Sequence, residues 1–477
     1  MKDKRKFYIN GEWVDPISTH DYQVINPANE EPCAIVSFGS DHDVNRAVGA
    51  AKEAFPAWSV TPSEERIDLV EQLLEAYKDR AQDFGEAMSI EMGAPIDFAK
   101  TKQFERGIIN MKGLIEAAKC FQFEEDFDPA RPDLRNFYEA HGVCALITPW
   151  NWPINQISLK VPAAALAGCS MVLKPSEESP LNAMLFAELI HEVGFPKGVF
   201  NLVNGDGRGV GTYLTKHPDI DLVSFTGSTR AGREILRNAA DGLKKVSLEL
   251  GGKGGNIIFS DADKDAVERG VRSVMLNSGQ SCDAPTRMIV QREIYDEAVK
   301  KAAEVISSIA ISAPSEQGDH IGPVVNQKQY DHIQSLIQKG VDEGASLIVG
   351  GTGRPNGFKN GYYVKPTLFA DAENSMTIAQ TEIFGPVLTI IPFDTEDEAI
   401  EISNNTVYGL GSYVQTIDGE KANRVARKLR YGMVTMNGVS RVPGQPFGGY
   451  KQSGIGREGG RWGLEDFLQL KSVTGWN

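Results

Sequence analysis

Cysteine and histidine are both scarce in this sequence, which has 5 Cys and 7 His among 477 residues. An odd and sparse set of cysteines excludes a scaffold stapled by disulfide bonds and indicates reduced thiols, as in the cytoplasm. The seven histidines are scattered in polar contexts, and no cluster of side chains has the spacing of metal ligands. We therefore expect no metal site.

Basic residues are too few for a surface that binds nucleic acid or an anionic membrane. The chain has 49 Lys and Arg against 64 Asp and Glu, a net charge of −15, whereas phosphate groups attract the opposite sign.

Long apolar runs are also lacking. The longest uncharged stretch, 142–159, contains Pro149, Asn151 and Pro153, which makes it a poor candidate to span a bilayer. The basic N-terminus is not followed by an apolar run, so we expect no secretory signal and a cytoplasmic location.

What is present indicates a soluble globular protein of two or three domains, with 41% hydrophobic and 24% charged residues. Apolar residues at helical spacing predict helices over 40–55, 63–84 and 108–118. From residue 142 the pattern changes to short apolar runs that alternate with helical stretches, which predicts a parallel α/β sheet. The runs are 143–147, 171–175, 199–203 and 222–225.

A second α/β unit begins after Gly251-Gly252, so a domain boundary is expected near residue 250. Its predicted strands are 256–259, 288–290, 346–349 and 387–391, and its long helices are 296–311 and 327–344. Segment 123–138 is polar and strand-like without a core pattern, and it is interpreted as an arm that pairs elsewhere.

Three segments carry residues of chemical interest. The strand 222–225 leads into Gly227-Ser228 and then a helix, a place where backbone N–H groups bind phosphate. The dinucleotide fingerprint is broken by Thr229, so this segment alone is as consistent with a plain strand-to-helix turn. Cys282 lies in a Gly/Ser-rich turn, unlike the four other cysteines, which fit a core. A position at a helix N-terminus would activate this thiol as a nucleophile.

The third segment holds Glu249 between two leucines. A carboxylate in such surroundings is either part of a structural ion pair or a base with a raised pKa. The residues alone leave both interpretations open, just as they leave Cys282 open between a nucleophile and a small core side chain.

Taken together, these segments resemble the aldehyde dehydrogenase family. The similarity covers nearly the whole chain, and the family's motifs occur in the family's order. They are Ile147-Thr148-Pro149-Trp150-Asn151-Trp152-Pro153, Lys174-Pro175-Ser176-Glu177, Phe225-Thr226-Gly227-Ser228, Leu248-Glu249-Leu250-Gly251-Gly252-Lys253, Gly279-Gln280-Ser281-Cys282, Glu382-Ile383-Phe384-Gly385-Pro386 and Pro446-Phe447-Gly448-Gly449-Tyr450-Lys451-Gln452-Ser453-Gly454.

The resemblance implies an α/β fold of two doubly wound parallel-sheet domains, a Rossmann-like cofactor domain and a catalytic domain, with a small β oligomerisation arm. The corresponding ranges are 1–121 with 141–250 for NAD binding, 251–440 for catalysis, and 122–140 with 459–477 for the arm and its contact. A homodimer or homotetramer is implied as well.

The same resemblance implies the catalytic roles. Cys282 attacks the aldehyde carbon as a thiolate, and the Asn151 amide with the Cys282 backbone N–H holds the oxyanion. Hydride transfer leaves a thioester on Cys282, and Glu249 activates the water that hydrolyses it. Asp283, which follows the nucleophile, is expected to point into the wall of the site.

Cofactor residues are implied in the same way. Lys174 and Glu177 correspond to the ribose-binding pair, and a carboxylate there favours NAD over NADP, which stays a weaker alternative. Gly227, Ser228 and the region of Trp150 correspond to the pyrophosphate contacts, and Glu382 and Phe384 to the clamp on the nicotinamide ribose.

The substrate channel is expected between the residues after Asn151 and those before Phe447. The expected lining residues are Trp152, Asn155, Gln156, Arg441 and Phe447. Arg441 either binds a substrate carboxylate or is a solvated loop residue or a member of an intersubunit ion pair.

Two other functions of the protein remain as alternatives. One is transfer of the acyl group to coenzyme A, which Glu249 disfavours, and the other is a non-enzymatic role of the same fold.

Overall fold

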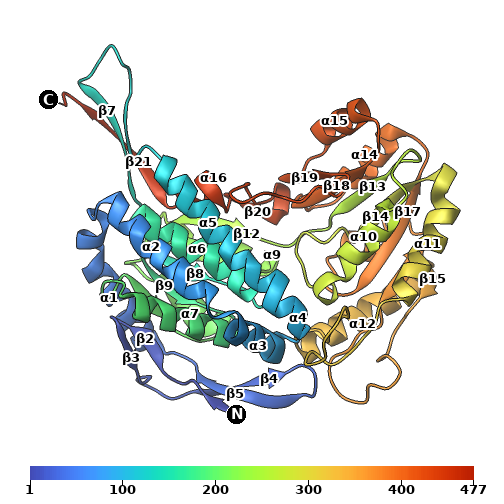
Figure 1. The fold of residues 1–477 in the computed structure, drawn as a ribbon, viewed down its shortest axis with the longest axis horizontal. Helices are drawn as coiled ribbons and strands as arrows, with labels where there is room; N and C mark the ends of the chain where they lie inside the picture. Colours follow the sequence, from blue (N-terminus) through green and yellow to red (C-terminus); the bar gives the residue numbers. More distant parts are fainter. Residues whose placement is uncertain (477) are drawn as a thin grey trace.

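Two large, mainly parallel sheets with helices on both faces form the body of the molecule (Figure 1). The computed structural model describes residues 1–476. The first sheet has eight strands, and its middle five, from β12 to β10, are parallel. In sheet order the strands are β20 (Gly454–Ile455), β12 (Lys245–Glu249), β11 (Leu222–Thr226), β8 (Val143–Ile147), β9 (Ser170–Lys174), β10 (Phe200–Leu202), β2 (Phe7–Ile9) and β3 (Glu12–Val14).

Alternate residues of the central strands enter two separate cores, which explains why these strands read as continuous apolar runs. Cys144 and Leu146 of β8 pack in one core, and Val143, Ala145 and Ile147 pack in the other. The first core is closed by α2 (Ser63–Lys78), α3 (Ala81–Met92), α5 (Phe104–Cys120), α6 (Pro153–Ala167) and α7 (Pro180–Val193). The second is closed by α1 (Asp41–Ser59), α8 (Thr212–Lys216) and α9 (Thr229–Ala240).

The second sheet has seven strands, all parallel except the edge strand β15. In sheet order they are β15 (Ser346–Val349), β16 (Thr367–Ala370), β17 (Val387–Phe393), β14 (Arg287–Gln291), β13 (Gly255–Ile258), β18 (Gly411–Gln415) and β19 (Met433–Met436). The helices around it are α10 (Ala266–Met275), α11 (Tyr295–Ser307), α12 (Gln327–Asp342), α13 (Thr377–Gln380), α14 (Glu396–Asn404) and α15 (Gly419–Lys428).

Two small sheets complete the fold. One joins β1 (Lys2–Asp3), β5 (Glu31–Ser37) and β4 (Asp21–Asn26). The other joins β21 (Leu468–Thr474), β7 (Leu134–Ala140) and β6 (Glu124–Asp126), and it projects from the body as an arm (Figure 1). The polar segment 123–138 therefore pairs with the C-terminal strand. The remaining short elements are α4 (Ile96–Phe98), α16 (Gly460–Glu465), η1 (Ala99–Gln103), η2 (Gly207–Gly211), η3 (Leu276–Gly279), η4 (Arg292–Ile294) and η5 (Lys451–Ser453).

The expected α/β architecture is confirmed, and the structure corrects its details. Strands β12, β16, β18 and β19 were not predicted. The helix predicted over 63–84 is two helices, because α2 ends at Lys78 and α3 begins at Ala81. Helix α6 was not predicted. It begins with Pro153 at its first turn, where proline fits, and nearly all of it is buried. Within residues 1–476, none of the helices has the length and apolar character that crossing a membrane requires.

Candidate active site

Several motif residues meet at one edge of the first sheet because parallel strands place their carboxyl ends together. Strand β8 leads into Trp150 and Asn151, β9 ends at Lys174, β11 ends one residue before Gly227, and β12 ends at Glu249. Residues far apart in the sequence are thereby brought to the same edge.

Cys282 lies in a loop with an unusual backbone. Asn277, Ser278 and Gly279 have φ of 53°, 56° and 76°, and a Cβ at Gly279 would lie 2.0 Å from the Gly385 carbonyl oxygen. The loop follows the C-terminal end of α10 and leads into β14. Cys282 therefore does not lie at a helix N-terminus, so a helix dipole of that kind does not lower the pKa of its thiol.

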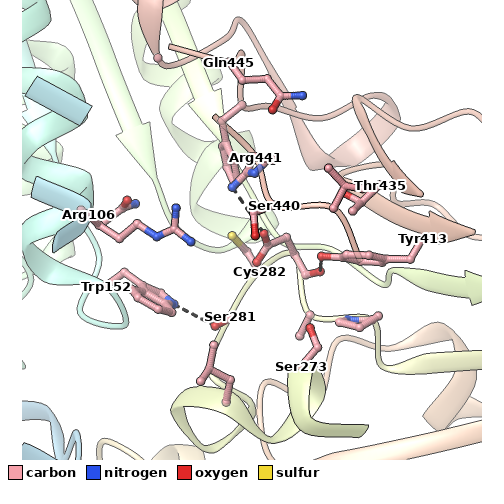
Figure 2. Close-up of a pocket in the computed structure, with 18 of the residues that line it drawn as sticks. Arg106, Trp152, Ser273, Ser281, Cys282, Tyr413, Thr435, Ser440, Arg441 and Gln445 are labelled. Atoms are coloured by element: carbon pink, nitrogen blue, oxygen red, sulfur yellow. Dashed lines mark hydrogen bonds and ion pairs between the residues drawn. The ribbon is translucent and has the colours of Figure 1, made fainter. Parts of the chain in front are cut away.

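A hydrogen-bond network fixes this loop against the segment after β8. The Asn151 amide donates to the Gln280 carbonyl at 3.0 Å, and the Asn277 amide donates to the Asn151 carbonyl at 2.9 Å. Trp152 Nε1 donates to Ser281 Oγ at 2.8 Å (Figure 2). Asn151 is buried, and since an amide nitrogen carries two N–H groups, one remains for another acceptor near Cys282.

The half-buried Cys282 thiol lies in acidic surroundings. Burial raises its pKa well above the ordinary value, and the carboxylates of Asp283, Glu382 and Glu249 raise it further. Asp283 lines the cavity and lies 3.8 Å from Arg441, so the expectation that it points into the wall is wrong. The resting thiol is therefore protonated and needs a base.

Glu249 ends β12 with its side chain buried and with neither carboxylate oxygen in a hydrogen bond. Burial, followed by the nearby Glu458 carboxylate, raises its pKa well above the ordinary value. Lys160 opposes this effect, but its ammonium group forms an ion pair with Glu458 at 2.5 Å. A buried carboxyl without partners is available for proton transfer.

Glu382 approaches the backbone that follows Glu249. Its Oε1 accepts a hydrogen bond from the Gly252 N–H at 2.9 Å, and burial raises its pKa to about 7. A Cβ at Gly252 would lie 2.2 Å from the Cys282 carbonyl oxygen, so Glu249, Glu382 and Cys282 share one small region. Phe384 packs edge-on against Trp150 with ring centroids 5.4 Å apart.

The remaining predicted cofactor residues lie at the ends of β9 and β11. Lys174 Nζ lies 3.6 Å from Glu177 Oε2, and Ser228 caps α9 by accepting a hydrogen bond from the Ala231 N–H. A carboxylate with a lysine suits ribose hydroxyls, and a capped helix N-terminus suits a pyrophosphate. The donor set therefore fits a dinucleotide. Among the described residues, no group of three or more His, Cys, Asp or Glu is arranged to hold a metal ion.

A cavity of about 350 Å³ opens at Cys282 (Figure 2). It is lined by Trp152, Asn155, Gln156, Arg441 and Phe447, as expected for the channel, whereas Lys174, Glu177 and Glu382 are not among its lining residues. Gln156 is only 3% exposed and accepts a hydrogen bond from Thr226 Oγ1, so it forms part of the floor.

Sequence reasoning missed the contribution of α5 to this cavity. Arg106 and Asn110 of α5 both line it, and the Asn110 amide donates to Asn155 Oδ1 at 3.0 Å. Their spacing of four residues places them on one face of a helix, which was the available signal. Nothing in the sequence indicated that this face lies opposite Cys282.

The chain matches the model of a known family across most of its length. The model described as the aldehyde dehydrogenase family matches residues 13–473. The chain is 47% identical to a 3-succinoylsemialdehyde-pyridine dehydrogenase of a Pseudomonas species, covering 100% of this chain and 99% of the relative. It is 46% identical to a putative aldehyde dehydrogenase of Staphylococcus saprophyticus, covering 100% of both.

Solved structures resemble this one closely. A crystal structure of an aldehyde dehydrogenase from Bartonella henselae has a TM-score of 0.99 and 53% identity, covering 100% of both chains. A mutant of aldehyde dehydrogenase C from Pseudomonas syringae, in complex with NAD+ and octanal, has a TM-score of 0.97 and 46% identity, covering 99% of this chain and 97% of that one.

Proposed function

Since the chain belongs to the aldehyde dehydrogenase family, we propose that it oxidises an aldehyde to a carboxylic acid with NAD, using Cys282, Asn151 and Glu249. The observation that carries this proposal is the meeting of a loop thiol, a buried amide and an unpartnered buried carboxylate at the sheet edge that also bears the residues proposed to bind the dinucleotide. The relative from P. syringae, crystallised with NAD+ and octanal, supports it.

The chemistry begins with deprotonation of Cys282. The pKa of the buried Glu249 carboxyl is raised well above its ordinary value, which makes its carboxylate a stronger base for the Cys282 thiol, whose own pKa is also raised. The thiolate then forms a bond to the aldehyde carbon. The free N–H of Asn151 and the Cys282 backbone N–H hold the oxygen as it becomes negative.

The second half-reaction releases the acid. Bound NAD supplies the acceptor for the hydride that leaves the adduct on Cys282. Glu249 loses the proton it took from Cys282 to solvent and, ionised again, accepts a proton from the water that attacks the thioester; the C–S bond then breaks and the Cys282 thiolate leaves. A hydrolytic base beside the thioester favours the free acid over transfer to coenzyme A.

The cofactor preference is proposed to be NAD rather than NADP. In this proposal the Glu177 carboxylate lies beside the adenosine ribose. The Lys174 ammonium group donates to the Pro175 carbonyl oxygen at 2.5 Å and faces Glu177. A negative 2′-phosphate at this position would be repelled by the Glu177 carboxylate. We expect a higher kcat/KM with NAD than with NADP, and Glu177→Gln to narrow the difference.

For the domains, we propose the ranges 1–121 with 141–250 for NAD binding, 251–440 for catalysis, and 122–140 with 459–477 for the arm and its contact. An assembly of two or four copies is part of the same proposal. Its support is the edge strand β21, which pairs only on its β7 side and exposes Leu470, because an unpaired edge invites another chain. Sedimentation analysis tests this, and a monomer at micromolar concentration would contradict it.

The reaction is tested by following NADH formation with a panel of aldehydes, with Cys282→Ala as the inactive control. The products are identified in the presence and absence of coenzyme A. Formation of the free acid in both conditions is the expected result, and a coenzyme A ester would contradict the hydrolytic step.

A further inference from the structure

The cavity at Cys282 has an unbalanced set of charges. Its charged lining residues, within the described part of the chain, are Arg106, Arg269, Arg441 and Asp283. Arg269 is neutralised outside the cavity by Asp263 at 2.6 Å and also donates to Gln415. Arg441 faces Asp283 at 3.8 Å, a separation beyond a good hydrogen bond. The positive charge of Arg106 is therefore not balanced by a carboxylate among the lining residues.

Arg106 lacks the partners that a half-buried guanidinium normally has. Burial and the charges of Arg441, Asp283 and Glu105 act on it, and it donates no hydrogen bond to any described residue. Glu105 is exposed on α5. Burial and the like charge of Arg441 lower the pKa of Arg106, which reflects an unfavourable position for a cation unless an anion joins it.

The two arginines reach the cavity from opposite parts of the fold. Arg106 comes from α5 of the first unit, and Arg441 comes from the loop after β19 of the second. Figure 2 shows both guanidinium groups directed toward the space beside the Cys282 sulfur. The Arg441 guanidinium also lies over the Phe447 ring at 4.8 Å, which restricts its orientation.

We propose that Arg106, together with Arg441, binds a carboxylate at the far end of the aldehyde substrate, so that the preferred substrates are aldehyde-acids. This inference rests on the proposed function and goes beyond it by naming the substrate class. A guanidinium presents a planar fork of donors that matches a carboxylate. A second guanidinium nearby supplies the further charge that a desolvated anion needs.

Arg106 is a specificity residue in this proposal, because it contacts the substrate away from the reacting carbon. The amide of Asn110, one turn along α5, is already bonded to Asn155 and Ser158, so it is not a competing partner for the anion. The distance from Cys282 to the two arginines, which lie on α5 and on the loop after β19, then determines which substrate chain length fits.

The test compares straight-chain aldehydes that end in a carboxylate with the methyl esters of the same acids, over a series of chain lengths. The quantity measured is the ratio of kcat/KM for the acid to that for its ester. Arg106→Gln should lower this ratio by roughly tenfold to a hundredfold, the effect of losing a hydrogen bond to a charged group. Arg441→Gln should lower it as well, and by less, because Arg441 already faces Asp283.

Two further variants keep the test sharp. Arg46→Gln removes the same charge from the exposed face of α1 and should leave the ratio unchanged. Arg106→Lys retains the charge without the fork and should restore part of the ratio. Thermal denaturation confirms that each variant is folded. An unchanged ratio in Arg106→Gln would overturn the proposal, and so would a wild-type protein that prefers the esters.

A binding measurement separates this proposal from the proposed function. Saturated dicarboxylates of the same lengths are titrated into the wild-type protein and Arg106→Gln by calorimetry. If no aldehyde is oxidised but the dicarboxylate binds and Arg106→Gln abolishes binding, the proposed function fails and the carboxylate site stands. If both proteins bind the dicarboxylates equally, or neither binds them, the carboxylate site is refuted whatever the activity.

Discussion

The loop that carries Cys282 and the end of β12 that carries Glu249 lie in the same small region, yet they differ in hydrogen bonding. The polar side chains around the loop are hydrogen-bonded, whereas the carboxylate of Glu249 is not. On the loop side, hydrogen bonds of about 3 Å join Asn151, Asn277 and Gln280 to one another and Trp152 to Ser281. On the β12 side, both oxygens of Glu249 are buried and unbonded.

This difference separates two physical tasks. A group that holds a developing charge works best when its position is fixed before the reaction. A group that moves a proton works best when neither of its charge states is strongly favoured, which requires that no strong donor stabilises the carboxylate. The same site therefore combines a hydrogen-bonded network with a carboxylic acid that forms no hydrogen bond.

The largest effect is expected at Glu249. Glu249→Gln keeps the shape but removes the base, and kcat should fall by roughly 10²–10⁴-fold, the usual contribution of a general base. Steady-state NADH formation checks this, with Glu53→Gln on the exposed face of α1 as a charge-matched control. A variant that keeps a near-normal kcat would show that Glu249 is not the base, and the difference between the two regions would then have no catalytic meaning.

Asn151 should have the next largest effect. Asn151→Ala removes the amide donor, and kcat should fall by roughly 10²–10³-fold, as for other oxyanion donors. Asn45→Ala, an exposed asparagine on α1, is the matched control. A change in KM without a change in kcat would contradict the role of this amide in holding the developing charge.

The pH dependence of kcat/KM should reflect the raised pKa of Glu249, whose carboxylate has no hydrogen-bond donor. Its pKa is raised, and Glu249 must be ionised to take the proton of the resting Cys282 thiol. Activity is therefore lost as pH falls through the raised pKa of Glu249, by about tenfold for each pH unit. A kcat/KM profile that stays flat down to the ordinary range of glutamate would contradict this.

The smallest effect is expected from the outer part of the network. Asn277→Ala removes the bonds to the Asn151 carbonyl and to Gln103, without touching the substrate. The free energy of unfolding should fall by about 1–3 kcal/mol, the cost of unsatisfied buried groups, and kcat should fall less than in Asn151→Ala. Chemical denaturation measures the first effect. A variant as stable as the wild type would show that the network does not hold the loop.

The sequence predicted β8, β9, β10 and β11 of the first sheet, because a strand that is buried on both faces forms an unbroken apolar run, as β8 and β9 do. Strand β12, whose first two residues are half-buried, was not predicted. Helix α6 was missed because Pro153 and Pro162 lie within it, and isolated prolines normally indicate an interruption.

Within the site, the motifs identified the residues but not their surroundings. The geometry at Cys282 depends on the left-handed backbone of Asn277 and Ser278, which the residue types only weakly favour. The contribution of Arg106 was not predictable, because helical periodicity indicates which face of α5 is apolar but not which distant loop lies opposite its polar face.

The pairing of β20 with β12 has a consequence for how the protein is made. Leu248 and Glu249 pair with Ile455 and Gly454, so the strand that carries the catalytic carboxylate gains its outer neighbour from a segment synthesised long after it. Contacts of such sequence separation form late, since a large loop must close first. A nascent chain therefore exposes the flank of β12 throughout the synthesis of the second unit.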